Sequence, residues 1–290
     1  MIEAKLLQIT VAGLTTGAIY ALMALGFHLV FVTARTLDFA YGAVVVMGGL
    51  VAYSLVVEWS LPLPLVLILV TLFGGAVGLG VSTAIIWPLR DRHPAAQVIS
   101  LLAAGLVVEN VAAVIWGKDS LPFPAFSGDT PIFVLGAAVN PQSFWVIGLS
   151  LSALIASNLI LYKTRLGRVL RATANDPFAA RLMGINVKNM YGVAFATSLG
   201  LGTLGGTIIS PITFAGGYFA LPLTVKGFTA SILGGIGTPF GAVMGGFLLG
   251  FIEAYMAGLI TTSYMGAISM AILLVILLLR PEGLFSSKGG

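Results

Sequence analysis

The stretch from Trp59 to Leu89 reads WSLPLPLVLILVTLFGGAVGLGVSTAIIWPL and contains no charged residue. A helix that crosses the hydrocarbon core of a bilayer needs roughly 20 apolar residues, so this stretch is long enough to span a membrane. Similar uncharged runs recur at 6–34, 39–57, 93–108, 130–162, 189–225, 227–252 and 254–279. The sequence therefore predicts an all-α, polytopic membrane helix bundle, forming one transmembrane domain over residues 1–290.

The composition supports a membrane protein. Hydrophobic residues make up 58% of the chain and charged residues only 8%, whereas soluble domains carry about 25% charged residues. The net charge of +4 does not indicate nucleic acid as a partner, because six of the fourteen basic residues lie between Lys163 and Lys188. Such clustering is typical of membrane topology. With no cysteine and only two histidines, the sequence predicts no disulfide, no metal site and no cofactor.

We expect eight or nine membrane segments. One of them, at about 222–236, is predicted to be short or broken, because it lies between Pro222 and the turn-prone run that starts at Gly234. Irregular backbone at membrane depth is tolerated only where protein or a water-filled cavity surrounds it, so this segment is expected to line a pathway. The other helices are predicted at about 8–32, 39–57, 63–87, 96–117, 143–162, 189–210, 239–258 and 264–280.

The basic residues predict how the chain is oriented. The segment 163–188 holds six basic residues and one acid, which places it in the cytoplasm by the positive-inside rule. The segment 118–142 holds one base, two acids and four prolines, and is predicted to be an ordered external loop. A count of nine crossings then puts the C-terminus in the cytoplasm and the N-terminus outside.

Glycine pairs spaced four residues apart predict close helix packing, because they let two backbones approach where lipid gives no hydrophobic drive. The pairs are Gly13 and Gly17, Gly74 and Gly78, Gly202 and Gly206, Gly241 and Gly245, and Gly246 and Gly250.

The sequence contains no motif for catalysis. It lacks H-E-x-x-H, G-x-S-x-G and the phosphate loop G-x-x-x-x-G-K-[ST]. We therefore expect no catalytic residue and no enzymatic activity, and any ATP hydrolysis must come from another subunit.

The cytoplasmic segment 163–188 also carries an apolar pattern near helical spacing, which a loop that only sets topology does not need. Asn175 and Asp176 before Pro177 form an N-cap signal. One short helix is predicted to end near Ala174, and a second to run from Pro177 to Met183, stopped by Gly184. These helices could lie on the membrane surface or dock in a groove of a partner, and periodicity alone leaves both open.

Within this segment Thr164 to Ile185 matches the pattern T-R-L-G-R-x-L-R-A-x-A-x-D-P-x-A-A-R-L-x-G-I. It resembles the cytoplasmic coupling segment of permease subunits in bacterial branched-chain amino acid ABC importers. Three further stretches extend the resemblance over nearly the whole chain, namely 17–26, 232–241 (ILGGIGTPFG) and 280–285 (RPEGLF).

The resemblance implies a multi-pass protein of the bacterial inner membrane that pairs with a second, similar permease. It further implies two ATP-binding subunits and a periplasmic or lipoprotein substrate-binding protein as partners. The residues carried over to the ATPase interface are Gly167, Arg168, Arg171, Ala172, Asp176, Ala179, Ala180 and Gly184.

One stretch departs from the family. Related permeases commonly read Asn-Phe-Ala-His-Gly near the start of the second helix, and this chain has Asp38, Phe39, Ala40, Tyr41 and Gly42. A carboxylate and a phenol replace an amide and an imidazole. If this patch touches the substrate, urea, short amides or another amino acid remain open beside a branched-chain amino acid.

Charged residues inside the membrane are functional candidates, because they are costly when they face lipid. Glu109 is predicted to be the deepest of them, either lining a pathway or bonded between helices. Lys226 is either an interfacial residue or a gate. Together with Asp38, Phe39 and Tyr41 they form the predicted translocation pathway.

Three other polar residues receive structural predictions. Glu253 is expected to be structural, Arg35 to form a local ion pair with Asp38, and His28 to be a packing residue. Two rival functions stay open. An ion-coupled secondary transporter would use Glu109, Asp38 or His28 as its coupling site, and an intramembrane enzyme lacks the paired residues it would need.

Overall fold

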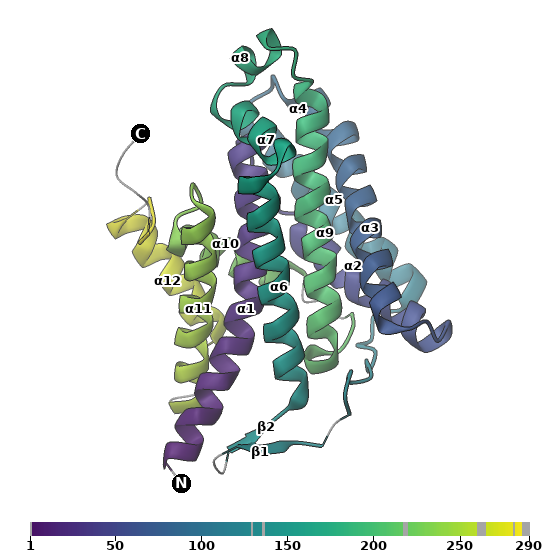
Figure 1. Cartoon of the computed structure of the whole chain (residues 1–290), viewed down its shortest axis with the longest axis vertical. Helices are drawn as coiled ribbons and strands as arrows, with labels where there is room; N and C mark the ends of the chain where they lie inside the picture. Colours follow the sequence, from purple (N-terminus) through teal and green to yellow (C-terminus); the bar gives the residue numbers. More distant parts are fainter. Residues whose placement is uncertain are drawn as a thin grey trace.

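The computed structural model describes residues 2–128, 130–134, 137–216, 220–259, 265–280 and 282–285. Within them the chain is an all-α bundle with one small hairpin (Figure 1). Seven helical stretches are long and apolar enough to cross a membrane, and two shorter apolar helices accompany them. Nine apolar segments in the described part of the chain agree with the predicted eight or nine.

The elements follow the chain in a simple order. They are α1 (Ile2–Ala34), α2 (Tyr41–Tyr53) continued by the π-helical turn η1 (Ser54–Glu58), α3 (Leu63–Val81) continued by η2 (Ser82–Ile86) and α4 (Trp87–Leu89), α5 (Pro94–Trp116), β1 (Ile132–Val134), β2 (Ala137–Val139), α6 (Pro141–Lys163), α7 (Arg165–Asn175), α8 (Pro177–Leu182), α9 (Val187–Thr213), α10 (Ala220–Gly234), α11 (Pro239–Leu259) and α12 (Met265–Leu279).

Helix α1 lies at the centre of the bundle and packs against α6, α9, α10 and α11. Figure 1 shows α7 and α8 at one end of the long axis, and the β1–β2 hairpin with the N-terminus at the other. After α12 the chain returns to α10, where the Leu284 and Phe285 N–H groups donate to the carbonyls of Leu233 and Gly234. The C-terminal segment is thus bound to the C-terminal end of α10.

The predicted segment at 222–236 is a short helix and is not broken between Ala220 and Gly234. Pro222 lies in its first turn, where the backbone N–H groups have no partner within the helix, so the missing N–H of proline costs little. The helix ends at Gly234, and Gly235 follows with a φ of +112°, a conformation that favours glycine.

The glycine pairs pack helix against helix, as predicted. A Cβ on Gly246 would lie 2.2 Å from the Ala21 nitrogen, and one on Gly250 would lie 2.3 Å from the Gly17 Cα, which brings α11 against α1. On α3, a Cβ on Gly78 would lie 2.4 Å from the Phe195 carbonyl oxygen of α9. The remaining pairs place α9 against α2 and α11 against α10.

Candidate functional site

A cavity of about 550 Å³ opens between α1, α2, α9 and α10. Small-molecule sites usually occupy about 300 to 1,000 Å³, so its size suits a small ligand. Most of its wall is aliphatic, with hydroxyl groups and one cation among the apolar side chains. The lining residues include Thr15, Thr16, Ile19, Tyr20, Val45, Val46, Ile209, Ser210, Ile212, Thr213, Leu223 and Lys226.

The cavity lies toward the end of the bundle that carries the hairpin. Its wall includes Phe214 and Gly216, just after α9, and Ala215 between them pairs with Leu121 of the loop before the hairpin. Phe214 and Gly216 have φ angles of +64° and +92°. This irregular backbone borders the cavity and a loop, where its polar groups can be satisfied.

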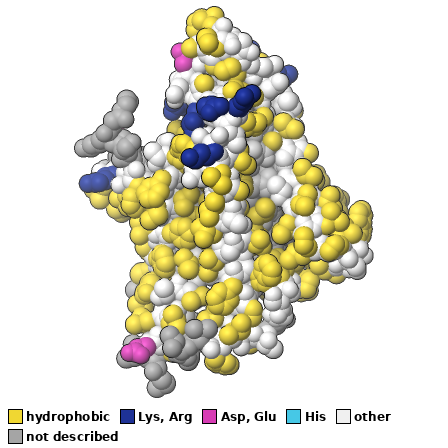
Figure 2. All heavy atoms as spheres, in the orientation of Figure 1, with side chains coloured by type: hydrophobic (Ala, Val, Ile, Leu, Met, Phe, Trp, Pro, Cys, Tyr) yellow, Lys and Arg dark blue, Asp and Glu magenta, His cyan; other side chains and the backbone are white. Residues whose placement is uncertain are grey.

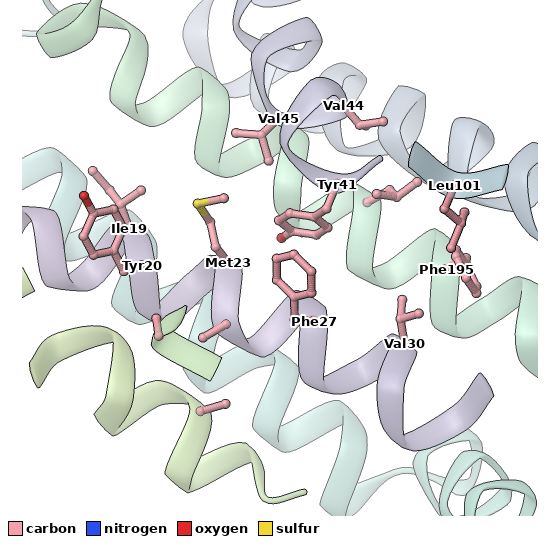
Figure 3. Close-up of a cluster of buried hydrophobic side chains, with 14 of the residues drawn as sticks. Ile19, Tyr20, Met23, Phe27, Val30, Tyr41, Val44, Val45, Leu101 and Phe195 are labelled. Carbon is pink, nitrogen blue, oxygen red and sulfur yellow. The ribbon is translucent and has the colours of Figure 1, made fainter. Parts of the chain in front are cut away.

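Aromatic rings fill the bundle between the cavity and the α7 end. The Phe27 ring lies 5.1 Å from the Tyr41 ring and 6.0 Å from the Phe228 ring, measured between centroids. Figure 3 shows Phe27 and Tyr41 together in the core. On α1, α2 and α10 alike, these rings lie closer to the α7 end than the residues that line the cavity. They therefore lie between the cavity and the α7 end of the bundle.

A polar cluster lies beside the cavity. The Lys226 ammonium lies 2.9 Å from Glu253 Oε2 and donates to the Tyr20 hydroxyl at 2.9 Å. Tyr20 in turn donates to Glu253 Oε2 at 2.7 Å, and the Ser269 hydroxyl donates to the other carboxylate oxygen. The Glu253 side chain is 1% exposed, and that of Lys226 is 21% exposed. Side chains from four helices thus form one ion pair with its hydrogen-bond partners in the membrane-spanning region.

This pairing has a clear energetic reason. A lone charge inside the membrane costs several kcal/mol, and an ion pair with further hydrogen bonds removes most of that cost. The carboxylate of Glu253 holds three donors, so it fixes where the Lys226 ammonium lies. Lys226 then presents its positive charge to the cavity.

The predicted pathway residues do not all meet at the cavity. Lys226 lines it, whereas Asp38 and Tyr41 are fully buried and Phe39 packs on Phe228 in the aromatic layer. Asp38 Oδ1 accepts the Ala40 N–H at 3.0 Å, and Oδ2 has no hydrogen-bond partner among the described residues.

The predicted ion pair between Arg35 and Asp38 is wrong. Arg35 is exposed, with its guanidinium beside the Phe31 ring, while Asp38 is buried. Arg35 has a φ of +53°, so the chain turns immediately after α1. This turn separates the two side chains although they are only three residues apart.

Glu109 is not the most buried acid of the membrane helices. Its side chain is half-buried at a space of about 20 Å³ between α5 and α2, which Lys118 and Ala220 also line. Glu253 is the more buried of the two acids inside the protein, and the depth of Glu109 in the membrane stays a prediction. His28 is a packing residue, as predicted, and its Nδ1 lies 2.7 Å from the Ile236 carbonyl oxygen.

The two short helices predicted within the segment 163–188 form as α7 and α8. Asp176 Oδ1 accepts the N–H groups of Phe178 and Ala179 at 2.8 and 3.0 Å, which caps α8. Gly184 follows α8 with a φ of +80°, a conformation that favours glycine. Helix α7 begins with Thr164 as its cap.

The residues that the family resemblance assigns to an ATPase interface fall into two groups, which differ in whether they face the protein or the solvent. Gly167, Arg171 and Ala180 face the protein itself. A Cβ on Gly167 would meet the Leu161 carbonyl oxygen, and Arg171 donates to that carbonyl at 2.8 Å while its guanidinium lies over the Tyr162 ring. The exposed group is Arg168, Ala172, Asp176, Ala179 and Gly184.

Part of the apolar pattern predicted in the segment 163–188 is exposed, and the polar cluster includes side chains that the sequence did not single out as site residues. Phe178, Leu182 and Met183 are 69%, 73% and 82% exposed at the tip of α8. At the cavity, Tyr20 and Ser269 complete the Lys226–Glu253 pair. A signal for that pair was present, because Lys226 and Glu253 are the only acid and base between residues 189 and 279. Opposite charges that are isolated in apolar helices are expected to pair.

Comparison with known proteins identifies similar chains. A family model described as "Branched-chain amino acid transport system / permease component" matches residues 9–279. The high-affinity branched-chain amino acid permease LivH of Escherichia coli is 26% identical, over 94% of this chain and 92% of LivH. BraD of Pseudomonas aeruginosa, with the same description, is 27% identical over 96% and 95%. A probable LivH of Methanocaldococcus jannaschii is 29% identical over 91% and 87%.

Proposed function

Since this chain belongs to the family of permease components of branched-chain amino acid transport systems, we propose that it is the membrane-spanning permease subunit of an ATP-driven amino acid importer. Branched-chain amino acids are the proposed substrates, because the similar permeases carry that description. The observation that carries the proposal is the family match over residues 9–279. A family of components also favours a multisubunit importer over a self-sufficient ion-coupled transporter.

The proposed partners are a second, similar permease, two ATP-binding subunits and a periplasmic or lipoprotein binding protein. This chain has no phosphate loop in its sequence, so the ATP-binding subunits would supply the hydrolysis and this chain would not act as an enzyme. We place α7, α8 and the C-terminus in the cytoplasm and the hairpin outside, in the inner membrane.

Helix α8 is the proposed contact with an ATP-binding subunit. It stands out from the end of the bundle (Figure 1), and three large apolar side chains at its tip are exposed. Figure 2 shows Lys and Arg side chains gathered below this tip, as expected at the cytoplasmic membrane surface. Exposed apolar side chains beyond that basic belt favour a protein groove over lipid.

The packing around α7 supports a route from this contact to the cavity. Leu170, Arg171 and Ala174 of α7 surround a small space with His28 of α1 and Pro239 of α11. Helices α1 and α11 also carry Tyr20 and Glu253 of the polar cluster. A displacement of α7 that moves α1 relative to α11 would therefore change the cavity wall.

A paired variant tests the proposal. We expect the double substitution Phe178→Ser and Leu182→Ser to abolish co-purification of the ATP-binding subunits and ATP-driven leucine uptake in proteoliposomes. The control is Phe133→Ser, which changes an equally exposed phenylalanine (75%) at the opposite end of the bundle. Uptake that follows an ion gradient without ATP-binding subunits would overturn the proposal. Unchanged ATPase binding in the double variant would overturn the role of α8.

A further inference from the structure

The wall of the cavity carries one positive charge, the ammonium group of Lys226, which has one N–H donor that is not used by the described residues. A lysine ammonium has three N–H donors, and Lys226 uses two of them on Glu253 and Tyr20. The described residues provide no hydrogen-bond partner for the third, and the side chain lines the cavity. Glu253 is not part of the cavity wall. Among the described residues that line the cavity, Lys226 is the only charged one, so the wall favours an anionic group.

The hydroxyl groups of the same wall present acceptors. The single hydroxyl proton of Thr15 goes to the Val11 carbonyl at 2.8 Å, and that of Thr213 goes to the Ile209 carbonyl at 3.3 Å. Each hydroxyl has one proton and two lone pairs. With the protons directed back to their own helices, the oxygen atoms keep lone pairs that can accept from a ligand. These groups suit an ammonium donor.

The remaining wall is aliphatic. Ile19, Val45, Val46, Ile209 and Leu223 come from four helices, and Figure 3 shows Ile19 beside Tyr20. The cavity therefore combines one cation, hydroxyl acceptors and branched aliphatic side chains. A zwitterionic α-amino acid with an aliphatic side chain has the complementary groups.

We propose that this cavity binds an aliphatic amino acid, with its carboxylate on Lys226, its ammonium group on the hydroxyl oxygens of Thr15 and Thr213, and its side chain against the aliphatic wall. Glu253 and Tyr20 act as positioning residues, because they hold the ammonium of Lys226 at the cavity. This inference rests on the proposed function and adds the groups that recognise the substrate.

The test uses the absence of cysteine from the chain. A single Ile212→Cys substitution puts one thiol into the cavity wall, and the uncharged reagent N-ethylmaleimide reports its accessibility in the assembled transporter without ATP or binding protein. We expect L-leucine to slow alkylation. Leucinol, which has a hydroxymethyl group in place of the carboxylate, should need an at least about tenfold higher concentration, as expected from the loss of a charge-assisted hydrogen bond. Phe133→Cys, outside the cavity, should not be protected.

Two variants separate the charge from the fold. Lys226→Met combined with Glu253→Gln removes both charges, and thereby avoids leaving a buried carboxylate without a partner. In it, leucine should protect no better than leucinol. Glu253→Gln alone keeps the ammonium, so leucine should still protect better than leucinol.

The outcomes distinguish the two proposals. Equal protection by leucine and leucinol in the parent, or full leucine protection in the double variant, would overturn the role of Lys226. ATP-driven leucine uptake by the same complex without any protection would overturn this site and leave the proposed function intact. Absence of ATP-driven leucine uptake would count against the proposed function.

Discussion

The cap of α8 offers the sharpest test of the proposed contact between this chain and an ATP-binding subunit. Asp176 Oδ1 accepts two backbone N–H groups, from Phe178 at 2.8 Å and from Ala179 at 3.0 Å. The helix has only six residues, and isolated helices of that length are unstable in water. It therefore depends on its cap and on what it touches.

Replacing Asp176 with alanine removes both hydrogen bonds. Loss of an N-cap side chain costs about 1 kcal/mol, which lowers the ratio of formed to unformed α8 about fivefold. We expect a similar fall in leucine taken up per ATP hydrolysed, measured in proteoliposomes with saturating binding protein. The bundle should keep its melting temperature in detergent, because α8 stands apart from it.

The matched control is Asp176→Asn. Asparagine caps helices about as well as aspartate, so its amide oxygen can accept the same two N–H groups while the charge is lost. We expect near-native coupling. If asparagine lowers coupling as much as alanine does, the partner recognises the carboxylate charge of Asp176, and helix capping is not the reason for its effect. If alanine is harmless, the population of α8 does not limit coupling.

Three further predictions follow from the packing. Gly246→Ala places a Cβ 2.2 Å from the backbone of α1 and should lower the unfolding free energy by about 1–3 kcal/mol. The control Gly80→Ala, with open space around it, should not lower it. Equal melting temperatures of the two variants in detergent would contradict the close approach of α1 and α11. Asp38→Asn keeps the acceptor for the N–H of Ala40 and should leave both melting temperature and leucine uptake intact; a folded variant without uptake would instead support the predicted place of Asp38 in the pathway. Arg171→Lys removes the guanidinium that stacks over the Tyr162 ring, an interaction that contributes about 1 kcal/mol, and should speed hydrogen exchange in α7. An exchange rate equal to the native one would rule out a stabilising role for this stacking.

Some side-chain contacts could not be predicted from the sequence, for a physical reason. Arg35 and Asp38 are close in the chain and oppositely charged, so a local ion pair was the natural prediction. The turn after α1 buries one side chain and exposes the other. Glu109 and Glu253 are both isolated acids within apolar helices, but only Glu253 forms an ion pair with a cation from another helix. Separation along the chain does not reveal which helix faces are neighbours.

The sequence by itself determined the membrane class, the helices, the short segment near 222–236 and the two capped short helices α7 and α8. These depend on apolar length, proline and glycine positions and local capping, all of which act within about one helical turn or one membrane thickness. Only the tertiary structure decided the cavity and the cluster of Tyr20, Lys226, Glu253 and Ser269, because α1, which carries Tyr20, is distant in the chain from the three consecutive helices α10, α11 and α12 that carry the other members. Which faces meet is set by the contact of glycine surfaces between helices, and that contact exists only after the bundle has assembled.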